Sequence, residues 1–320
     1  QVKFKIIQYN KNLPLIIDPT LVFATYTGSL SDNFGMTATY DIQGNAYTAG
    51  MCFGPSYPLS AGAFQINYMG GTGYGGDISI SKFNPTGSSL LYSTYLGGSG
   101  NESAESIIVD NLGELVIFGR THSVDFPITS GAFQTFNAGN FDLVVTKLNA
   151  TGTALNASTY LGGNQDEGVN GGVFLGGLHY NYSDDLRGSV IVDESNNVYI
   201  ASNTISSNFP VTSGCFQSSL SGIQDACIAK LNPSLSGLIF STYFGGSSDD
   251  GAYNIALNTN NQLYVTGGTN SSDFYTTAGS FHPSAQGGVD GFLSLFSFNG
   301  NFVQASTYIG TAQYDQSYFV

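Results

Sequence analysis

The sequence predicts an all-β protein, a β-propeller made of four-stranded antiparallel blades. Three observations carry this prediction. One short motif recurs five times, fixed distances separate most of its copies, and each interval contains four short runs typical of β-strands. Repeats of this kind predict the architecture, because each copy is one supersecondary unit and neighbouring copies bury a shared core.

The recurring motif is serine or alanine, then threonine, tyrosine, a variable residue and glycine. Its five tyrosines are Tyr26, Tyr95, Tyr160, Tyr243 and Tyr308. From Tyr95 the chain runs 15 residues to a turn at Asp110, 32 more to Asp142 and 18 more to the next tyrosine. The same steps follow Tyr243. The first repeat carries 4 extra residues and the third carries 18, so the scaffold tolerates insertions at two places.

The chain divides into a leader and a repeat region. Residues 1–20 do not match the repeat and contain Pro14 and Pro19, so we interpret them as the tail of a preceding domain and a linker. Residues 21–320 carry the repeats. The predicted blades cover about 28–95, 96–160, 161–243 and 244–308, with the start of a fifth at 309–320.

Each repeat contains four runs with strand composition. In the second repeat they cover residues 106–109, 115–118, 143–148 and 157–160. The runs are nearly continuous in apolar residues, which indicates strands packed on both faces. Groups such as Asn-Pro-x-x-Gly supply the turns. Four strands in a period of 65 residues have the size of a propeller blade.

The phase of the repeats predicts partial strands at both ends. The chain begins its repeat region on a lone fourth strand at 21–26 and ends on a first strand near 317–320, with four complete blades between them. We therefore expect a fragment of a larger propeller.

Composition excludes several classes of function. The net charge is −14 with only eight basic residues, which argues against nucleic acid and against an anionic membrane surface. No apolar run approaches the roughly 20 residues of a transmembrane segment, and residues 1–20 lack the apolar core of a signal peptide. The three cysteines have no metal-ligand spacing and are expected to be small core residues, with a Cys215–Cys227 disulfide left open.

The order of motifs resembles a known family. S-T-Y-x-G-G, an acidic pair, D-x-x-G-N, D-F-P-x-T-x-G-A-F-Q and D-x-x-x-x-K-L-N together resemble the SBBP-type β-propeller repeat, over residues 21–320. The resemblance implies a large cell-surface or secreted protein of the Bacteroidetes, exported by type IX secretion and of the gliding-motility-associated kind. It also implies an extracellular, outer-membrane-associated location and contact with secretion components.

Acidic or amide pairs recur six and seven residues after four of the tyrosines. The candidate metal ligands among them are Asp32, Asn101, Glu102, Asp166, Glu167, Asp249 and Asp250. Hard oxygen ligands suit Ca²⁺, so a calcium site near the channel mouth is one interpretation. The alternative is that these side chains cap turns where the chain crosses from rim to channel. The fifth copy departs from the pattern, with Tyr314-Asp315.

The sequence contains few features of a catalytic site, and we expect that the protein is not an enzyme. The three histidines fall in different repeats, and there is no phosphate loop, zinc spacing or nucleophile elbow. Asp249-Asp250 imitates the carboxyl pair of a glycosidase, but adjacent residues on one loop rarely have the required separation. The preferred function is an interaction or structural module of adhesion type. A carbohydrate-active hydrolase and a calcium-dependent glycan-binding propeller are the alternatives.

The insertion in the third repeat is the predicted binding surface. Its residues fall between Tyr160 and Asp193, in the connection from one blade to the next, and function concentrates on long loops held by a rigid scaffold. The candidate contacts for a protein or surface glycan are His179, Tyr180, Tyr182, Asp184, Asp185 and Arg187. Tyrosine and arginine are favoured where partners bind. A decorative loop or a channel plug is the alternative.

Overall fold

The computed structural model describes residues 21–70, 76–170, 178 and 187–320, which form sixteen strands in four sheets. Blade 1 contains β1 (Asn33–Tyr40), β2 (Ala46–Cys52), β3 (Asp77–Phe83) and β4 (Leu90–Leu96). Blade 2 contains β5 (Glu102–Val109), β6 (Leu115–Thr121), β7 (Asp142–Leu148) and β8 (Leu155–Leu161). Blade 3 contains β9 (Ser189–Val192), β10 (Val198–Thr204), β11 (Asp225–Leu231) and β12 (Leu238–Phe244). Blade 4 contains β13 (Asp250–Leu257), β14 (Leu263–Thr269), β15 (Asp290–Phe296) and β16 (Val303–Ile309). Within the described residues there is no helix of the length and apolar character needed to cross a membrane.

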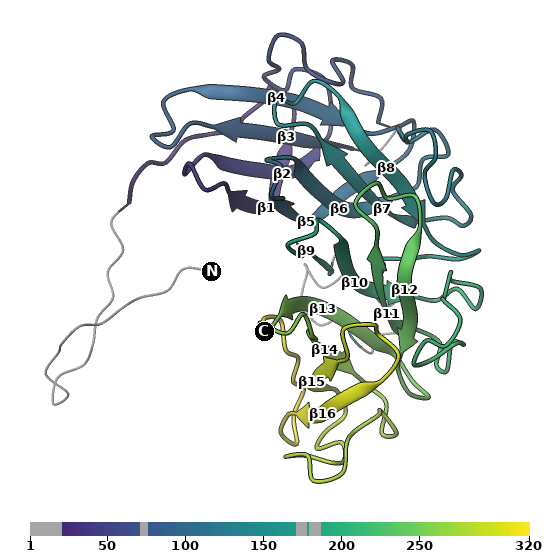
Figure 1. Cartoon of the computed structure of the whole chain (residues 1–320). Coiled ribbons are helices and arrows are strands. Elements are labelled where there is room, and N and C mark those ends of the chain that lie inside the picture. The colour runs from purple at the N-terminus through teal and green to yellow at the C-terminus, as the bar shows by residue number, and fades with distance from the viewer. Residues whose placement is uncertain (1–20, 71–75, 171–177, 179–186) are drawn as a thin grey trace, which may run out of the picture.

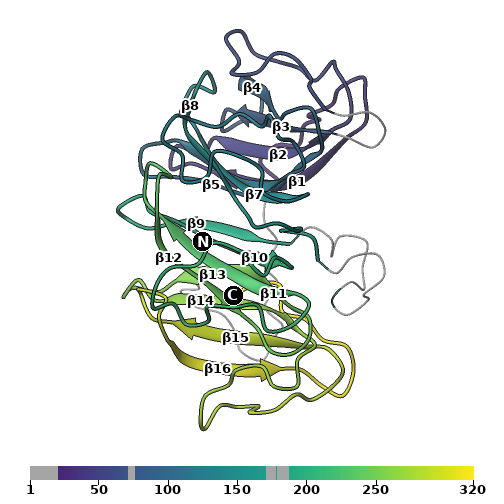
Figure 2. The ribbon, with the colours of Figure 1, turned by 90° about the vertical axis from the view of Figure 1, so that its right-hand side faces the viewer.

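Strand order within each sheet follows the chain, and all neighbouring strands are antiparallel. The four sheets lie side by side in an arc (Figure 1), and Figure 2 shows them stacked from blade 1 to blade 4. The first strands β1, β5, β9 and β13 line the inner side of the arc, where β5 contacts β1 and β9, and β9 contacts β13. This arrangement confirms the predicted class: an all-β propeller of four-stranded blades.

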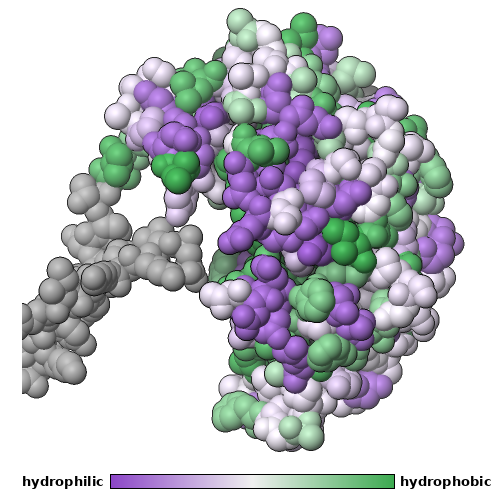
Figure 3. All heavy atoms as spheres, in the orientation of Figure 1, coloured by the Kyte–Doolittle hydropathy of each residue, from purple (hydrophilic) through white to green (hydrophobic). Residues whose placement is uncertain are grey.

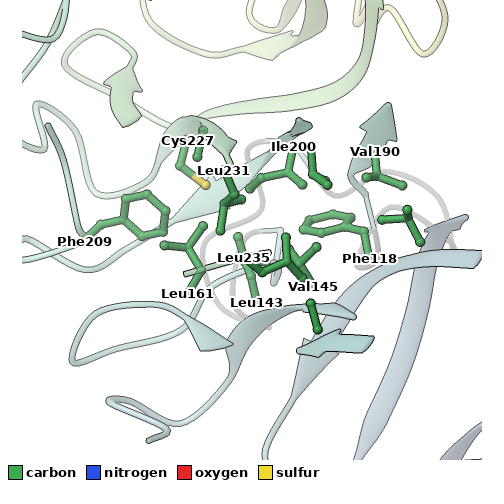
Figure 4. Packing of buried hydrophobic residues seen from close by; sticks show 14 of the residues in the cluster. Phe118, Leu143, Val145, Leu161, Val190, Ile200, Phe209, Cys227, Leu231 and Leu235 are labelled. Atoms are coloured by element: carbon green, nitrogen blue, oxygen red, sulfur yellow. The ribbon is translucent and has the colours of Figure 1, made fainter. Parts of the chain in front are cut away.

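The core lies between the blades. One apolar cluster joins blades 1 and 2, a second joins blades 2 and 3, and a third joins blades 3 and 4. Between blades 2 and 3, Leu143 and Val145 of β7 face Ile200 of β10 (Figure 4). Every residue of β7 and of β10 is buried. Because each inner sheet packs on both faces, its strands need apolar residues at successive positions, as the sequence indicated.

Contacts between blades also repeat. The Phe64 amide of blade 1 donates to the Gly152 carbonyl of blade 2 (3.0 Å), and the Phe133 amide of blade 2 donates to the Leu235 carbonyl of blade 3 (2.9 Å). Phe281 occupies the same motif position in blade 4 and is 82% exposed. The outer face of blade 4 therefore has the groups of a blade interface without a neighbouring blade among the described residues.

Neither of the two partial strands expected from the sequence forms in the structure. Residues 21–27 form no strand, because no described strand lies beside them to pair with. The Phe23 ring nevertheless packs against Gly87, as the Phe240 ring of blade 3 packs against Gly300 of blade 4. At the other end, residues 310–320 also form no strand, although the Ser317 amide donates to the Gly267 carbonyl at 3.1 Å.

Candidate functional site

The motif tyrosine of each complete blade holds the loop between the second and third strands. In blade 2 the Tyr160 hydroxyl accepts a hydrogen bond from the Phe126 amide (3.0 Å) and donates one to the Ser123 carbonyl (2.9 Å). The tyrosines of the other three blades make the same two bonds and are equally buried. The most regular feature of the sequence is therefore structural.

The threonine and glycine of the motif bind a glutamine in the same loop. The Gln134 backbone amide donates to the Thr159 hydroxyl (3.0 Å), and the Gly162 amide donates to the Gln134 side-chain oxygen (3.1 Å). The Gln134 side-chain nitrogen then donates to Asp142 (2.9 Å). Blades 1 and 3 repeat these bonds. The aspartate that opens each third strand is thus part of the same loop support.

The second member of each acidic pair caps the turn that follows the motif. Glu167 accepts hydrogen bonds from the Gly163 amide (3.0 Å) and the Thr204 hydroxyl (2.7 Å). The equivalent carboxylates Glu102 and Asp250 accept equivalent amide and hydroxyl bonds in their blades. These bonds correspond to the capping interpretation that the sequence left open beside the calcium one.

The fifth copy keeps this cap although its sequence departs from the pattern. Asp315 accepts a bond from the Thr311 amide at 2.6 Å. Its own amide donates to the Val289 carbonyl (2.9 Å), as the Glu167 amide donates to the Phe141 carbonyl (2.7 Å). Asp315 is therefore the structural equivalent of Glu167.

The first member of each pair acts mainly through its backbone. These residues are Asp32, Asn101, Asp166 and Asp249. Each carbonyl oxygen accepts a bond from the residue just after the second strand of its blade, which extends the ladder. The Asp166 side chain also accepts from the Phe141 amide (3.1 Å). Across the described ranges, no three His, Cys, Asp or Glu side chains gather as a metal site requires.

Buried carboxyl groups meet in pairs at the blade junctions. An oxygen of Asp142 and one of Glu167 both lie beside Gly162, where a side chain would collide with them. Burial raises the pKa of Asp142 to about 6 and the pKa of Glu167 to about 8, against the hydrogen bonds that favour the ionised forms. The same causes raise the pKa of Asp77 to about 7 and of Asp250 to about 8. These carboxyl groups therefore keep their protons at pH values well above those at which Asp and Glu usually ionise.

The three lysines of the repeat pair with the turn aspartates. The Lys147 ammonium lies 3.0 Å from Asp110 in blade 2, and it also donates to the Asn196 carbonyl of blade 3 (3.4 Å). Blades 1 and 3 contain the equivalent pairs Lys82–Asp41 and Lys230–Asp193, at 3.4 and 3.1 Å. In blade 4 both partners change together, to Leu295 and Asn258. The lysines are therefore structural ion pairs.

The predicted binding loop falls largely outside the described residues. The predicted contacts outside the described residues are His179, Tyr180, Tyr182, Asp184 and Asp185. Arg187 is described and half-buried, and it lines a central pocket of about 650 Å³. The pocket lies between the inner strands of the arc, and its lining comes from β1, β5, β6, β9, β13 and residues 187–188 and 318–319.

A β-bulge directs one residue of each of three inner strands into this pocket. The pairing register of β5 skips from Ala104 to Ser106, which leaves Glu105 as the extra residue. The same irregularity occurs at Met36 in β1 and at Tyr253 in β13. Bulges re-aim side chains, and all three residues line the pocket. The bulge is therefore the same in these three blades, whereas the side chain at the bulged position differs between them.

Glu105 is the unusual group in the pocket. Both of its carboxyl oxygens are shielded from solvent and have no hydrogen-bond partner in the described part of the chain. They lie beside Gly168 and Gly188, at positions that a side chain on either glycine would crowd. Burial raises the pKa of Glu105 to about 7, although the positive charge of Arg120 opposes the rise. Perturbed groups in a cleft mark candidate functional sites.

Both arginines of the protein line the same pocket. Arg120 on β6 donates from Nη1 to the Gly168 carbonyl (2.8 Å), and its guanidinium lies 4.7 Å from the centre of the Phe141 ring. The Arg187 guanidinium lies 4.5 Å from the centre of the Tyr318 ring. The three described lysines belong to the turn aspartates instead, so the pocket concentrates positive charge in an acidic protein.

Sequence reasoning found Arg187 but missed Glu105 and Arg120. The available signal was irregularity within a regular repeat. Three residues after the capping carboxylate the repeats carry Glu105, Tyr253 and Tyr318 in different copies, so the position is not constrained by blade packing. Fixed spacing identifies the residues that recur in every blade and build the scaffold. It does not identify residues such as Glu105 and Arg120, which occur in one blade only.

No protein-family model matches the chain, and the comparison with curated proteins found no match. Among solved structures, quinohemoprotein alcohol dehydrogenase from Comamonas testosteroni aligns with 87% of this chain at 9% identity and a TM-score of 0.43. This chain covers 41% of that enzyme's length. BamB from Moraxella catarrhalis aligns with 90% of this chain and 93% of its own, at 11% identity and a TM-score of 0.19. At these scores neither likeness bears on function, and the propeller assignment rests on the four blades.

Proposed function

We propose that this chain is a non-enzymatic propeller module of SBBP type that captures a protein or glycan at the cell surface. Export by type IX secretion and an adhesive role belong to the same proposal, on the strength of the motif order in the sequence. The loop around residues 179–187 and the central pocket beside Arg187 are its proposed contact surface.

One observation carries the choice of a binding module over a hydrolase. The recurring carboxylates are bonded within the scaffold, and Glu105 is the one carboxyl group among the described residues that line the pocket. Glycosidases use two carboxyl groups that flank the scissile bond. Asp249 and Asp250, the pair suggested by the sequence, are 7% and 0% exposed, so neither faces a substrate.

The hydrophilic residues on the inner side of the arc favour a partner with a polar surface. Figure 3 shows hydrophilic residues gathered along the inner side of the arc on the face that it displays. The net charge of −14 favours partners that are neutral or basic at the outer surface, with the pocket as a local exception.

The test combines turnover and capture. The purified chain is incubated with panels of glycans, peptides and esters, and in parallel it is immobilised and exposed to intact cells and to a glycan array. We expect capture without turnover. Hydrolysis that disappears in Asp249→Ala or Glu105→Gln would overturn the proposal, as would a chain confined to the cell interior in surface-labelling experiments.

A further inference from the structure

We propose that the outer face of blade 4 binds a second copy of this chain, in a symmetric dimer that joins blade 4 to blade 4. Blade 4 forms one end of the arc (Figures 1 and 2). Its outer face contains a groove of about 480 Å³, lined by Tyr264, residues 277–281, Leu293, Leu295 and residues 304–307. This contact goes beyond the proposed function, which does not depend on it.

The same face is a blade interface in the other three blades. Leu293 lies in the third strand of blade 4, opposite Thr307, and is partly exposed. Its equivalents in the third strands of blades 1 to 3 are completely buried, and they are Ile80, Val145 and Ile228. The face that blades 1 to 3 cover with a neighbouring blade is therefore open in blade 4, and apolar surface of this kind gains stability when it is buried.

The Phe281 ring supplies a protruding group beside the groove. It is 82% exposed, and it stacks on the His282 ring with ring centres 4.3 Å apart, which holds it in place. Its equivalents pack against the core cluster that each blade shares with the next, and they are Phe64, Phe133 and Phe216. Blade 4 thus carries an exposed ring and a groove on one face. A two-fold axis places the ring of each copy against the groove of the other, as a self-complementary interface requires.

The groove has no charge to oppose the meeting of two acidic chains. Lysine stands at the Leu295 position in blades 1 to 3, and Lys147 donates to the Asn196 carbonyl of the next blade (3.4 Å). In blade 4 the apolar Leu295 lines the groove, and no charged residue is among the described residues that line it. Two copies with a net charge of −14 each can therefore approach here without bringing like charges into contact.

The other end of the arc does not complement this face. The side that blades 2 to 4 turn to the preceding blade has buried residues at two matched positions, namely Ile117 with Val144, Ile200 with Cys227, and Val265 with Phe292. Blade 1 has Thr48 and Ser79 at these positions. Covering hydroxyl groups with apolar surface costs free energy unless they are hydrogen-bonded. A contact between two blade 4 faces is therefore favoured over a head-to-tail contact of blade 4 with blade 1.

The size of the face predicts a weak dimer. Strands β14, β15 and β16 have seven residues each, so the four-stranded sheet measures about 23 Å by about 19 Å, or about 440 Å² per copy. A pair of copies buries about 900 Å², to which residues 277–281 add, and this lies at the lower end of specific interfaces. We expect a Kd of about 1–100 μM.

Sedimentation velocity of the full chain measures the association directly. The concentration runs from about 1 μM to about 200 μM, which brackets the expected Kd. We expect a change from monomer to dimer without larger species, because a two-fold contact closes on itself. Species that grow beyond the dimer show a head-to-tail contact, and a monomer at every concentration shows that a second copy does not occupy the face. Either result would overturn the proposal.

Two variants alter the face, and two are matched controls. Phe281→Asp and Leu295→Lys each put a charge into the apolar contact and should raise the Kd by about tenfold or more. The lysine variant also copies the residue of blades 1 to 3. Phe298→Asp and Tyr40→Asp alter rings that are 64% and 55% exposed and lie outside the groove, so they should leave the Kd unchanged.

The controls decide between the interface and its alternatives. A dimer that persists in Phe281→Asp removes the blade 4 contact. An equal loss in Phe298→Asp shows an effect of net charge alone, and a loss in Tyr40→Asp shows a contact through blade 1; each contradicts the proposal. Circular dichroism and melting establish that the variants are folded. Phe281 is exposed, so its substitution gives a folded variant even where Leu295→Lys does not.

Discussion

Glu167 allows a direct test of how the blade junctions work. Its carboxyl group is fully buried and accepts bonds from the Gly163 amide and the Thr204 hydroxyl. Burial raises its pKa to about 8, from an ordinary value of 4.5. Folding therefore favours the protonated form. The contribution of Glu167 to stability is fully present below about pH 4.5 and is lost as the pH rises through about 8.

The size of the effect follows from the shift. One pKa unit corresponds to about 1.36 kcal/mol, so the full shift of Glu167 amounts to about 5 kcal/mol. Between about pH 5 and about pH 8, linkage gives a loss of about 3–4 kcal/mol in the free energy of unfolding. Asp77, Asp142 and Asp250 act in the same direction, because burial raises the pKa of each. The wild-type protein should be more stable at the lower pH.

The substitution Glu167→Gln isolates one group. Glutamine keeps a side-chain acceptor and cannot titrate, so the variant should lose about 3–4 kcal/mol of pH dependence between about pH 5 and about pH 8. Urea unfolding at both pH values measures this difference. Glu194→Gln, at an exposed turn position, is the matched control. A wild-type protein at least as stable at about pH 8, or a variant with unchanged pH dependence, would refute the reasoning.

Three further predictions concern the motif residues. Tyr160→Phe removes the hydroxyl that joins Phe126 to Ser123 and should destabilise the protein by about 1–3 kcal/mol, whereas Tyr26→Phe, at a residue 97% exposed, should change nothing in the same melt. Lys147→Met leaves Asp110 buried without its cation and should cost about 3–5 kcal/mol in urea unfolding; adding Asp110→Asn, which copies blade 4, should recover most of that loss. Exchange of Ca²⁺ for a chelator should move the melting temperature by less than about 1 °C, because the capping carboxylates are already bonded; a shift of several degrees would restore the calcium interpretation.

The sequence predicted the blades because the residues that build them are the ones that repeat. Tyr160 recurs because every complete blade must hold its loop. The lysines recur in blades 1 to 3 because the buried turn aspartates there need a cation. The paired change to Leu295 and Asn258 shows that the constraint acts on the pair and not on either residue. A paired change of this kind is visible in the sequence itself.

The pocket could not be predicted in the same way. Glu105 reaches it through a β-bulge, and a one-residue change in register leaves no composition signal. Arg120 and Arg187 are 67 positions apart and meet only because the inner strands converge. The lone fourth strand predicted at 21–26 is absent for a related reason: a strand needs a partner, and its own sequence does not show whether one lies beside it.

The central claim is that the repeated motif residues build the scaffold of each blade, and the motif tyrosines are their clearest case. The most direct measurement is the free energy of unfolding in urea of Tyr160→Phe, of its equivalent Tyr243→Phe and of Tyr26→Phe. The account predicts a loss of about 1–3 kcal/mol in Tyr160→Phe and in Tyr243→Phe, because each loses the same two hydrogen bonds, and no change in the exposed Tyr26→Phe. Wild-type stability in Tyr160→Phe and Tyr243→Phe, or an equal loss in Tyr26→Phe, would contradict it.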